Sequence, residues 1–211
     1  MDCKLSNRLL LATNNPSKTH EISDSLQKIN LEVLSLADFD KKKFAPEPPE
    51  DGETFTENAR IKAEFWFQQT GISTLADDSG ILVEALPGEL GVRTVRFGKG
   101  ENASDEEWLD YFLKKMKGMK NRKAKLVCTL AFVQKEQAIK FFQGEVEGEI
   151  LEKATVPLLP RIPLSSVFLA DGADKVFAAM STTEKARFSH RGKALGKFRE
   201  FIRSSNNKSR E

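Results

Sequence analysis

The sequence has 211 residues and an apolar fraction of 39%, which is enough for one compact domain with a substantial core. Its 33 Lys and Arg side chains nearly balance 31 Asp and Glu, so the formal charge of +2 argues against binding to duplex DNA or an anionic membrane surface. The two cysteines, Cys3 and Cys128, lie far apart, which argues against a disulfide framework and a zinc site. The apolar run 9–12 is too short for a signal peptide and no run approaches a membrane-spanning length, so we expect a soluble, cytoplasmic protein.

The first predicted unit is a strand, a tight turn and a helix. Residues 8–13 are largely apolar and indicate a buried strand, which ends at the polar turn 14–16, and an amphipathic helix follows from Ser17. Such a unit places free backbone N–H groups and the ammonium of Lys18 at a helix N-terminus, where they suit a phosphate chain. Ordinary capping of the helix by Asn and Ser is the simpler alternative, and the glycines of a Walker loop are absent.

A second strand is predicted at 31–36, followed by a loop at 40–52 whose prolines exclude a regular element. The next helix begins at Thr54, which stands three residues before Glu57 in the spacing of a capping box. Glu57 is therefore either a capping residue only or, if the apolar side of this helix faces the core, a carboxylate near the mouth of a cleft.

The most informative stretch is Ala76-Asp77-Asp78-Ser79-Gly80, which lies between two apolar runs. We expect the two carboxylates at the end of a strand, where adjacent side chains point to opposite faces. Hard oxygen ligands in that place suit Mg²⁺ and the deprotonation of water. A capped polar turn is the alternative, because Asp, Ser and Gly are the residues that dominate turns.

The second half of the chain continues the α/β pattern. Arg93 and Arg96 follow a turn-rich loop and suit either phosphate oxygens or a solvated basic edge. The basic run 114–125 lacks interleaved aromatic residues, so we expect no nucleic-acid partner. The remaining predicted elements are a helix capped by Ser104, a hairpin of strands 126–133 and 138–149, a proline-rich loop at 154–164, a short strand at 166–170, and a helical region from 182 to 203 interrupted at 189–192.

Three separated segments thus carry complementary chemistry: Lys18 at a helix N-terminus, the carboxylates at 77–78, and the late run Ser189-His190-Arg191. A serine-hydrolase triad fits poorly, because Ser and His are adjacent and there is no nucleophile elbow. Cations and carboxylates without zinc spacing point to a polyphosphate and Mg²⁺, with water as the nucleophile.

Motifs in this order resemble the inosine/xanthosine triphosphate pyrophosphatase family. The resemblance runs from about residue 9 to residue 196 and rests on Thr13-Asn14-Asn15 with Lys18 and Glu21, Gly52, Thr54-Phe55, Glu57-Asn58-Ala59, Lys62-Ala63, 76–80, Gly91-Val92 with Arg96, Glu184-Lys185, and 189–195. It implies an α/β fold with a mixed central sheet flanked by helices and two lobes around a central cleft. We expect one bilobed domain at 1–203, a polar tail at 204–211, and a homodimer.

The resemblance also implies an activity and roles for individual residues. The activity is Mg²⁺-dependent hydrolysis of deaminated purine nucleoside triphosphates (ITP, dITP and XTP) to the monophosphate and pyrophosphate. The implied catalytic residues are Asp78, Glu57 and Lys18, and the implied metal ligands are Glu57, Asp77 and Asp78. The implied substrate-binding residues are Thr13, Asn15, Lys18, Ser79, Lys185, His190 and Arg191.

One segment departs from the family pattern. Members carry a glycine-rich stretch with an aromatic residue and an Asp before the last helix, where this chain has 161–168, with Leu164 in the aromatic place and Ser165 in the Asp place. A leucine has no π face and a hydroxyl does not replace a carboxylate. The alternative function is therefore a catalytically weak or specificity-altered member that binds nucleotides or a protein partner.

Overall fold

The computed structural model describes residues 7–27, 29, 31–97 and 103–208. The chain forms two compact units, one made of residues 1–78, 129–143 and 194–211 and the other of residues 79–128 and 144–193. Six strands are hydrogen-bonded in the order β2-β1-β3-β4-β5-β6: β1 Arg8–Ala12, β2 Glu32–Ser35, β3 Thr74–Val83, β4 Lys123–Val133, β5 Lys140–Ile150 and β6 Phe168–Ala170. β1 runs parallel to β2 and β3, whereas β5 and β6 are antiparallel, so the predicted mixed α/β sheet is confirmed.

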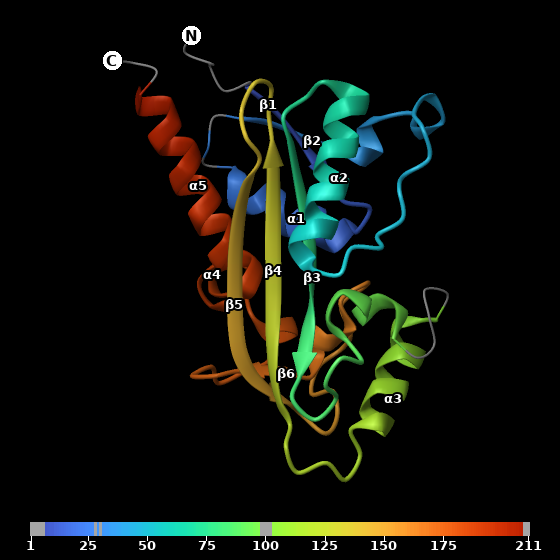
Figure 1. Cartoon of the computed structure of the whole chain (residues 1–211). Coiled ribbons are helices and arrows are strands. Elements are labelled where there is room, and N and C mark those ends of the chain that lie inside the picture. The colour runs from blue at the N-terminus through green and yellow to red at the C-terminus, as the bar shows by residue number, and fades with distance from the viewer. Residues whose placement is uncertain (1–6, 28, 30, 98–102, 209–211) are drawn as a thin grey trace. The chain divides into compact units, whose positions relative to one another are not determined.

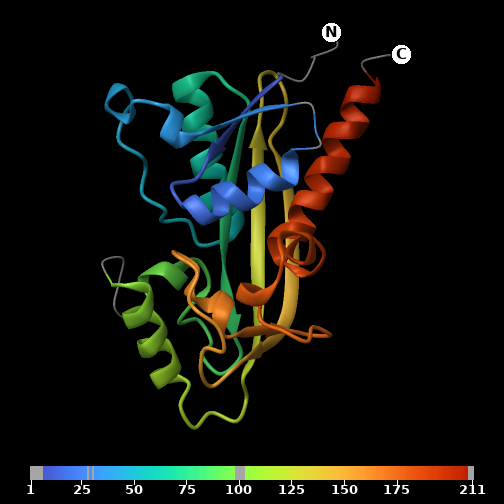
Figure 2. The same cartoon turned by 180° about the vertical axis from the view of Figure 1, so that it is seen from behind.

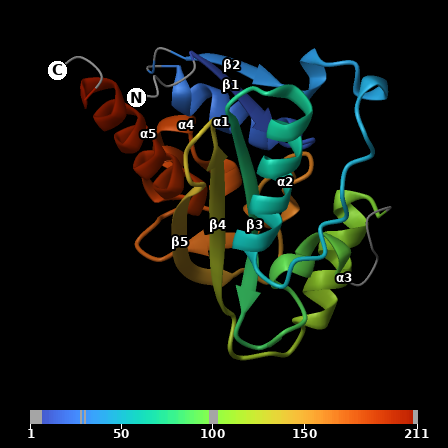
Figure 3. The ribbon, with the colours of Figure 1, turned by 45° about the horizontal axis from the view of Figure 1, so that its top comes forward.

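In the first unit, β1 lies between β2 and β3, and a helix covers each face of these strands. α1 (Pro16–Leu26) follows β1 and α2 (Phe55–Thr70) precedes β3, and Figures 1 and 2 show them on opposite faces of the β1–β3 pair. Figure 3 shows β2 beside β1, its parallel partner. The two faces have different neighbours, so a residue of β3 meets either α1 or α2 according to its place in the strand's alternation.

Buried apolar residues hold this unit together. One core cluster joins the strands to α2 and includes Leu10, Ala59, Ala63, Trp66 and Ala76. Phe198 of the last helix, α5 (His190–Lys208), packs edge to face against Phe132 and Phe142, with ring centroids 5.3 and 5.4 Å apart. This face of α5 is therefore buried in the core of the first unit.

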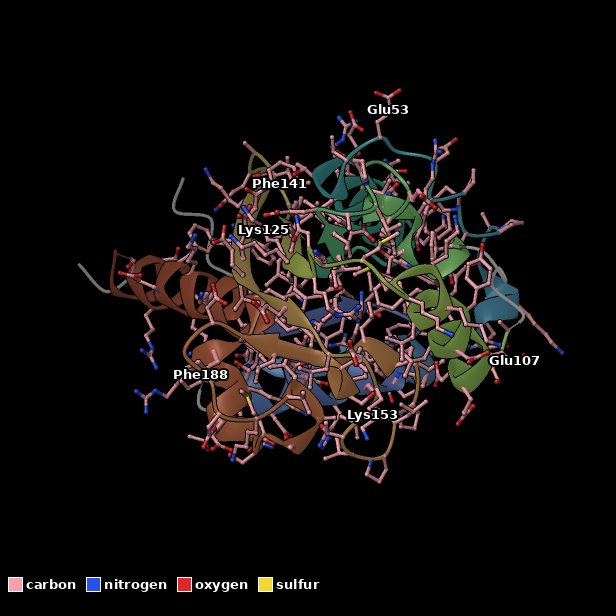
Figure 4. All side chains as sticks on the ribbon, turned by 90° about the horizontal axis from the view of Figure 1, so that it is seen from below. Glu53, Glu107, Lys125, Phe141, Lys153 and Phe188 are labelled. Atoms are coloured by element: carbon pink, nitrogen blue, oxygen red, sulfur yellow. The ribbon has the colours of Figure 1, made fainter. Side chains whose placement is uncertain are left out.

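The second unit has its own core, which gathers aromatic residues of α3 (Asp105–Lys115) with residues of the sheet and the later loops. Trp108 and Phe112, four residues apart and so on one face of the helix, stack with their ring centroids 5.5 Å apart. On the surface, Lys125 of β4 (Figure 4) forms cross-strand ion pairs with Glu145 (3.1 Å) and Glu147 (3.4 Å) of β5.

Several predicted boundaries need correction. β3 does not end at the aspartate pair but runs through it to Val83. The break near the C-terminus is confined to Ser189, between α4 (Thr182–Phe188) and α5, and α5 continues to Lys208, past the predicted end at residue 203. Cys3 and the side chain of Arg96 lie outside the described residues. Within the described part of the chain, no helix is both long enough and apolar enough to cross a membrane.

Candidate active site

The turn between β1 and α1 is built around Asn15. Its side-chain oxygen accepts hydrogen bonds from the backbone N–H groups of Ser17 (3.0 Å) and Lys18 (3.3 Å), and Thr13 Oγ1 in turn accepts from Asn15 N (3.2 Å). The expectation of free N–H groups is therefore wrong at positions 17 and 18, because the capping side chain already uses them. Lys18, the predicted phosphate contact, lies in the first turn of the helix that Asn15 caps.

Lys18 is held by Asp77. Its ammonium donates to Asp77 Oδ1, and the Asp77 side chain is fully buried whereas that of Lys18 is 16% exposed. Asp77 lies in β3 and Lys18 in the first turn of α1, so the pair ties this helix to the sheet. A buried carboxylate needs such a partner, since unpaired burial of a charge is costly.

The next residue of β3, Asp78, is held by a lysine of α2. Lys62 Nζ lies 3.0 Å from Asp78 Oδ1, 2.9 Å from the backbone oxygen of Asp77, and 3.3 Å from Glu50 Oε2. The two adjacent aspartates thus have different lysine partners from different helices, as the alternation of a strand requires. This part of the site gathers Asp78 and Glu50 around one ammonium group.

Burial and charge set the protonation of this pair. Burial raises the pKa of Asp78 above its ordinary value, although the ammonium groups of Lys62 and Lys18 oppose the rise. Burial acts to lower the pKa of Lys62, but the charges of Asp78 and Glu50 and the hydrogen bond to Asp78 outweigh it, so the pKa of Lys62 is raised. Lys62 is therefore a cation, and Asp78 is a carboxylate that holds a proton more readily than an exposed one.

Asp78 also has an oxygen that the protein leaves open. Oδ2 is buried and accepts no hydrogen bond from any residue that the structure describes. A buried carboxylate oxygen without a donor calls for a ligand, a cation or a water. The described residues contain no group of three or more His, Cys, Asp or Glu side chains arranged for a metal ion, but Mg²⁺ is commonly held by one or two carboxylates together with phosphate oxygens. Asp78 and the neighbouring Glu50 fit that kind of site.

Glu57, by contrast, caps α2. Its Oε2 accepts from the backbone N–H groups of Glu53 (2.8 Å) and Thr54 (3.1 Å), and Thr54 Oγ1 accepts from Glu57 N (3.1 Å), so the predicted capping box is confirmed. The side chain of Glu53 points away from the ribbon (Figure 4). The capping contacts use one oxygen of Glu57, and its proposed catalytic and metal roles stay predictions.

The loop before α2 is fixed by a close approach. Gly52 N donates to the side-chain oxygen of the buried Asn58 (2.8 Å), and a Cβ on Gly52 would lie only 2.7 Å from that oxygen. No larger residue fits there without moving the loop. Asn58 and Gly52 therefore position the segment that brings Glu50 to Lys62.

Residues of the second unit form a separate group. Arg191 Nη2 donates to Ser79 Oγ (3.1 Å), and His190 stacks on Phe177 with ring centroids 6.3 Å apart and an interplanar angle of 12°. Both His190 and Arg191 are buried, and Lys185 is half-buried on α4. The structure thus brings Ser79 and Arg191 together and supports the ring of His190.

The corner between α4 and α5 positions His190 and Arg191. Ser189 ends α4, and its Oγ accepts from Gly192 N (2.9 Å) at the start of α5. A Cβ on Gly192 would lie 2.5 Å from the backbone oxygen of Ala186 and 2.6 Å from that of Lys185. Glycine is required because the two helices meet backbone to backbone at this point.

Comparison with known proteins identifies the family of the chain. The model described as the Ham1 family matches residues 9–201. The chain belongs to the Ham1 family. It is 40% identical over 194 residues to a protein of Thermus thermophilus named dITP/XTP pyrophosphatase, with 89% of this chain and 88% of that protein covered. A protein of the same name from Leptospira interrogans is 38% identical over 200 residues, with 95% and 99% covered.

Solved structures of Ham1 proteins share the fold. The Ham1 protein of Staphylococcus aureus has a TM-score of 0.78 at 29% identity, and that of Coxiella burnetii has a TM-score of 0.79 at 29% identity. Each comparison covers 93% of this chain and 98% of the other. The resemblance read from the motifs, including the α/β class, is therefore confirmed.

The departing segment 161–168 is folded on itself in this Ham1 chain. Ser165 Oγ donates to the backbone oxygen of Ile162 (2.7 Å), and Leu164 packs against the core of the second unit. The ring of Phe168 is fully buried in the same core. The segment contains no carboxylate, and its aromatic ring and the Ser165 hydroxyl are engaged within the protein.

Lys62 and Glu50, which lie beside Asp78, are not among the site residues predicted from the sequence. Lys62 lies on the same side of α2 as the buried residues Asn58, Ala59 and Ala63, and a lysine within an otherwise buried stripe is a signal that the sequence contains. Glu50 had no such signal, because its loop has no periodic pattern.

Proposed function

We propose that this Ham1 protein hydrolyses deaminated purine nucleoside triphosphates (ITP, dITP and XTP) to the monophosphate and pyrophosphate, with Mg²⁺ as its cofactor. The observation that carries the proposal is the buried Asp78 carboxylate, with one oxygen held by Lys62 and the other without a donor in the described protein. The names of the relatives, dITP/XTP pyrophosphatase, support the substrate class.

In this proposal Asp78 is the general base. Its open Oδ2 accepts a proton from the water that attacks the α-phosphorus, a new P–O bond forms, and the bond to the β-phosphate oxygen breaks to release pyrophosphate. The raised pKa of Asp78 improves it as a proton acceptor. Lys18, held by Asp77, neutralises charge on the departing pyrophosphate.

Asp78 and Glu50 would hold the metal ion, and bound Mg²⁺ would neutralise phosphate charge and favour a nucleophilic water. Asp77 and Glu57, the other two ligands that the resemblance implies, already serve Lys18 and the helix cap, so we assign them supporting roles. Glu50 takes the place of Glu57 in this proposal because it shares Lys62 with Asp78.

Base recognition is assigned to the cationic residues of the second unit. A 6-oxo purine accepts hydrogen bonds where adenine carries an amino group, so donors select for it. Since segment 161–168 supplies no carboxylate, selectivity depends on the remaining proposed contacts. The proposed substrate-binding residues stay those implied by the resemblance: Thr13, Asn15, Lys18, Ser79, Lys185, His190 and Arg191.

The test is pyrophosphate release from a panel of ITP, dITP, XTP, ATP and GTP with Mg²⁺. We expect release from the first three to be well above that from ATP and GTP, and we expect Asp78→Asn to abolish it while the circular dichroism spectrum stays unchanged. Equal rates on all five would refute the substrate class, and full activity of Asp78→Asn would remove Asp78 from the mechanism. The alternative of a binding protein without catalysis is not favoured, given the enzymes among its relatives.

The proposal includes a homodimer in the cytoplasm and a single domain at 1–203 with a polar tail at 204–211. Light scattering after size exclusion tests the dimer, because a mass near 23.7 kDa would indicate a monomer. Limited proteolysis tests the boundary: α5 runs past residue 203, so a cut is expected after the helix rather than at that residue.

A further inference from the structure

Lys62 has a contact set that a surface lysine does not have. Its ammonium donates hydrogen bonds to three oxygens: the backbone oxygen of Asp77 (2.9 Å), Oδ1 of Asp78 (3.0 Å) and Oε2 of Glu50 (3.3 Å). The Lys62 side chain is 14% exposed. An ammonium group has three N–H donors, so these three acceptors match its donors.

The contacts restrict Asp78 in two ways. Lys62 donates to the backbone oxygen of Asp77 and to the side chain of Asp78, and it therefore fixes the position of the Asp78 carboxylate relative to the backbone of β3. It also binds only Oδ1, which leaves Oδ2 as the oxygen without a donor among the described residues. Lys62 thus fixes the orientation of the Asp78 carboxylate, and with it the place at which the second oxygen is available to a ligand.

Another cation near Asp78 does not replace this contact. Lys18 is close enough to influence Asp78, but its ammonium is hydrogen-bonded to Asp77 Oδ1. A variant without the Lys62 ammonium would leave the Asp78 carboxylate free to rotate about its side-chain bonds. Both of its oxygens would then be buried acceptors without the Lys62 donor, which is unfavourable.

We propose that Lys62 is a positioning residue of this enzyme: it orients the Asp78 carboxylate so that Oδ2 faces the reacting water, and it holds Glu50 beside it. The inference rests on the proposed function for its kinetic consequence. Its structural consequence, the orientation of Asp78, can be measured whether or not the protein is a pyrophosphatase.

The kinetic test compares Lys62→Met and Lys62→Arg with the wild type on ITP and Mg²⁺. We expect Lys62→Met to lower kcat by about 100-fold, the size of effect that a misplacement of about 1 Å produces, with KM changed by less than about threefold. Lys62→Arg keeps a cationic donor and is expected to recover part of kcat. Lys125→Met is the matched control, because it also removes a lysine with two carboxylate partners but on the surface of the other unit.

A merely structural ion pair gives a different pattern. In that case Lys62→Met would lower the melting temperature while the folded fraction keeps its kcat, and this result would overturn the inference. Binding of a non-hydrolysable α,β-methylene analogue of ITP, measured by calorimetry, separates positioning from binding. We expect its affinity to be retained, and a loss of affinity parallel to the loss of kcat would assign Lys62 to substrate binding instead.

Crystals of the wild type and of Lys62→Met give the readout that does not depend on activity. We expect the Asp78 carboxylate to turn in the variant, and an unchanged orientation would overturn the inference. If the wild type released no pyrophosphate from any triphosphate, the proposed function would fail, while the orientation of Asp78 would still decide the role of Lys62.

Discussion

The buried pair of Lys18 and Asp77 gives a prediction whose size follows from its surroundings. Lys18→Met removes the cation and keeps the length of the side chain, so Asp77 is left as a fully buried carboxylate without this partner. Breaking a buried pair from one side costs about 3–5 kcal/mol, and we expect about 3 kcal/mol because Lys18 is 16% exposed. For a chain of this length that is a fall in melting temperature of roughly 6–12 °C.

The double variant Lys18→Met with Asp77→Asn tests the reasoning, because it removes both charges. We expect it to be more stable than Lys18→Met by about 1–2 kcal/mol, since the buried carboxylate that has lost its lysine is gone, even though an amide is buried in its place. Urea unfolding of the two single variants, the double variant and the wild type completes the cycle.

Lys114→Met is the control. Lys114 and Asp110 form a close pair at 2.6 Å, but their side chains are 73% and 63% exposed, so little or no measurable change in stability is expected. If Lys18→Met were no more destabilising than Lys114→Met, or if the effects of Lys18→Met and Asp77→Asn simply added, the buried charge of Asp77 would not be the cause.

The remaining predictions concern acid, the helix corner and the metal. Hydrogen bonds from Lys175 and from Ser181, the N-cap of α4, hold the pKa of Glu184 at about 2, below its ordinary 4.5. The contribution of Glu184 to stability is therefore present above pH 4.5 and lost as the pH falls toward 2. In a plot of melting temperature against pH, Glu184→Gln should flatten the curve in that window. Gly192→Ala should lower both melting temperature and kcat, because its Cβ would lie 2.5 Å from the Ala186 backbone oxygen. Glu50→Gln should raise the Mg²⁺ concentration needed for half-maximal activity, whereas Glu57→Gln should mainly lower thermal stability by about 1 kcal/mol; the reverse result would restore Glu57 as the ligand.

Local chemistry predicted the helix starts well. Thr54 and Ser104 both accept from the backbone N–H three residues on, and each receives the return contact from a glutamate, as the sequence spacing indicates. These contacts lie within one turn of the chain, so no knowledge of the tertiary fold is needed to expect them.

The aspartate pair shows where local chemistry gives the wrong structure. Asp, Ser and Gly have low strand propensity, and residues 76–80 therefore suggest a strand end or a turn. In the fold, Lys18 and Lys62 neutralise Asp77 and Asp78 from two different helices, and β3 continues through them. The partners are distant in the sequence, so a propensity calculated from neighbours has no access to them.

Separation in the sequence also explains why Glu50 is absent from the predicted site residues. Its proposed role depends on a hydrogen bond from Gly52 to Asn58 and on the ammonium of Lys62, twelve residues later, and neither changes the appearance of the loop in the sequence. The proposed site residues Lys18, Asp78 and Arg191 stand in the motifs that carry the family resemblance, whereas Glu50 is an ordinary acidic residue in a polar loop.

The alternation of β3 gives its charged pair a structural consequence beyond the site. Asp77 meets Lys18 of α1 and Asp78 meets Lys62 of α2, and these helices cover opposite faces of the strand pair (Figures 1 and 2). A slip of β3 by one residue against β1 would exchange the faces and turn each carboxylate from its lysine toward the wrong helix. The apolar residues around them are buried on both faces and give little protection against such a slip, so the two ion pairs specify the register that the active site needs.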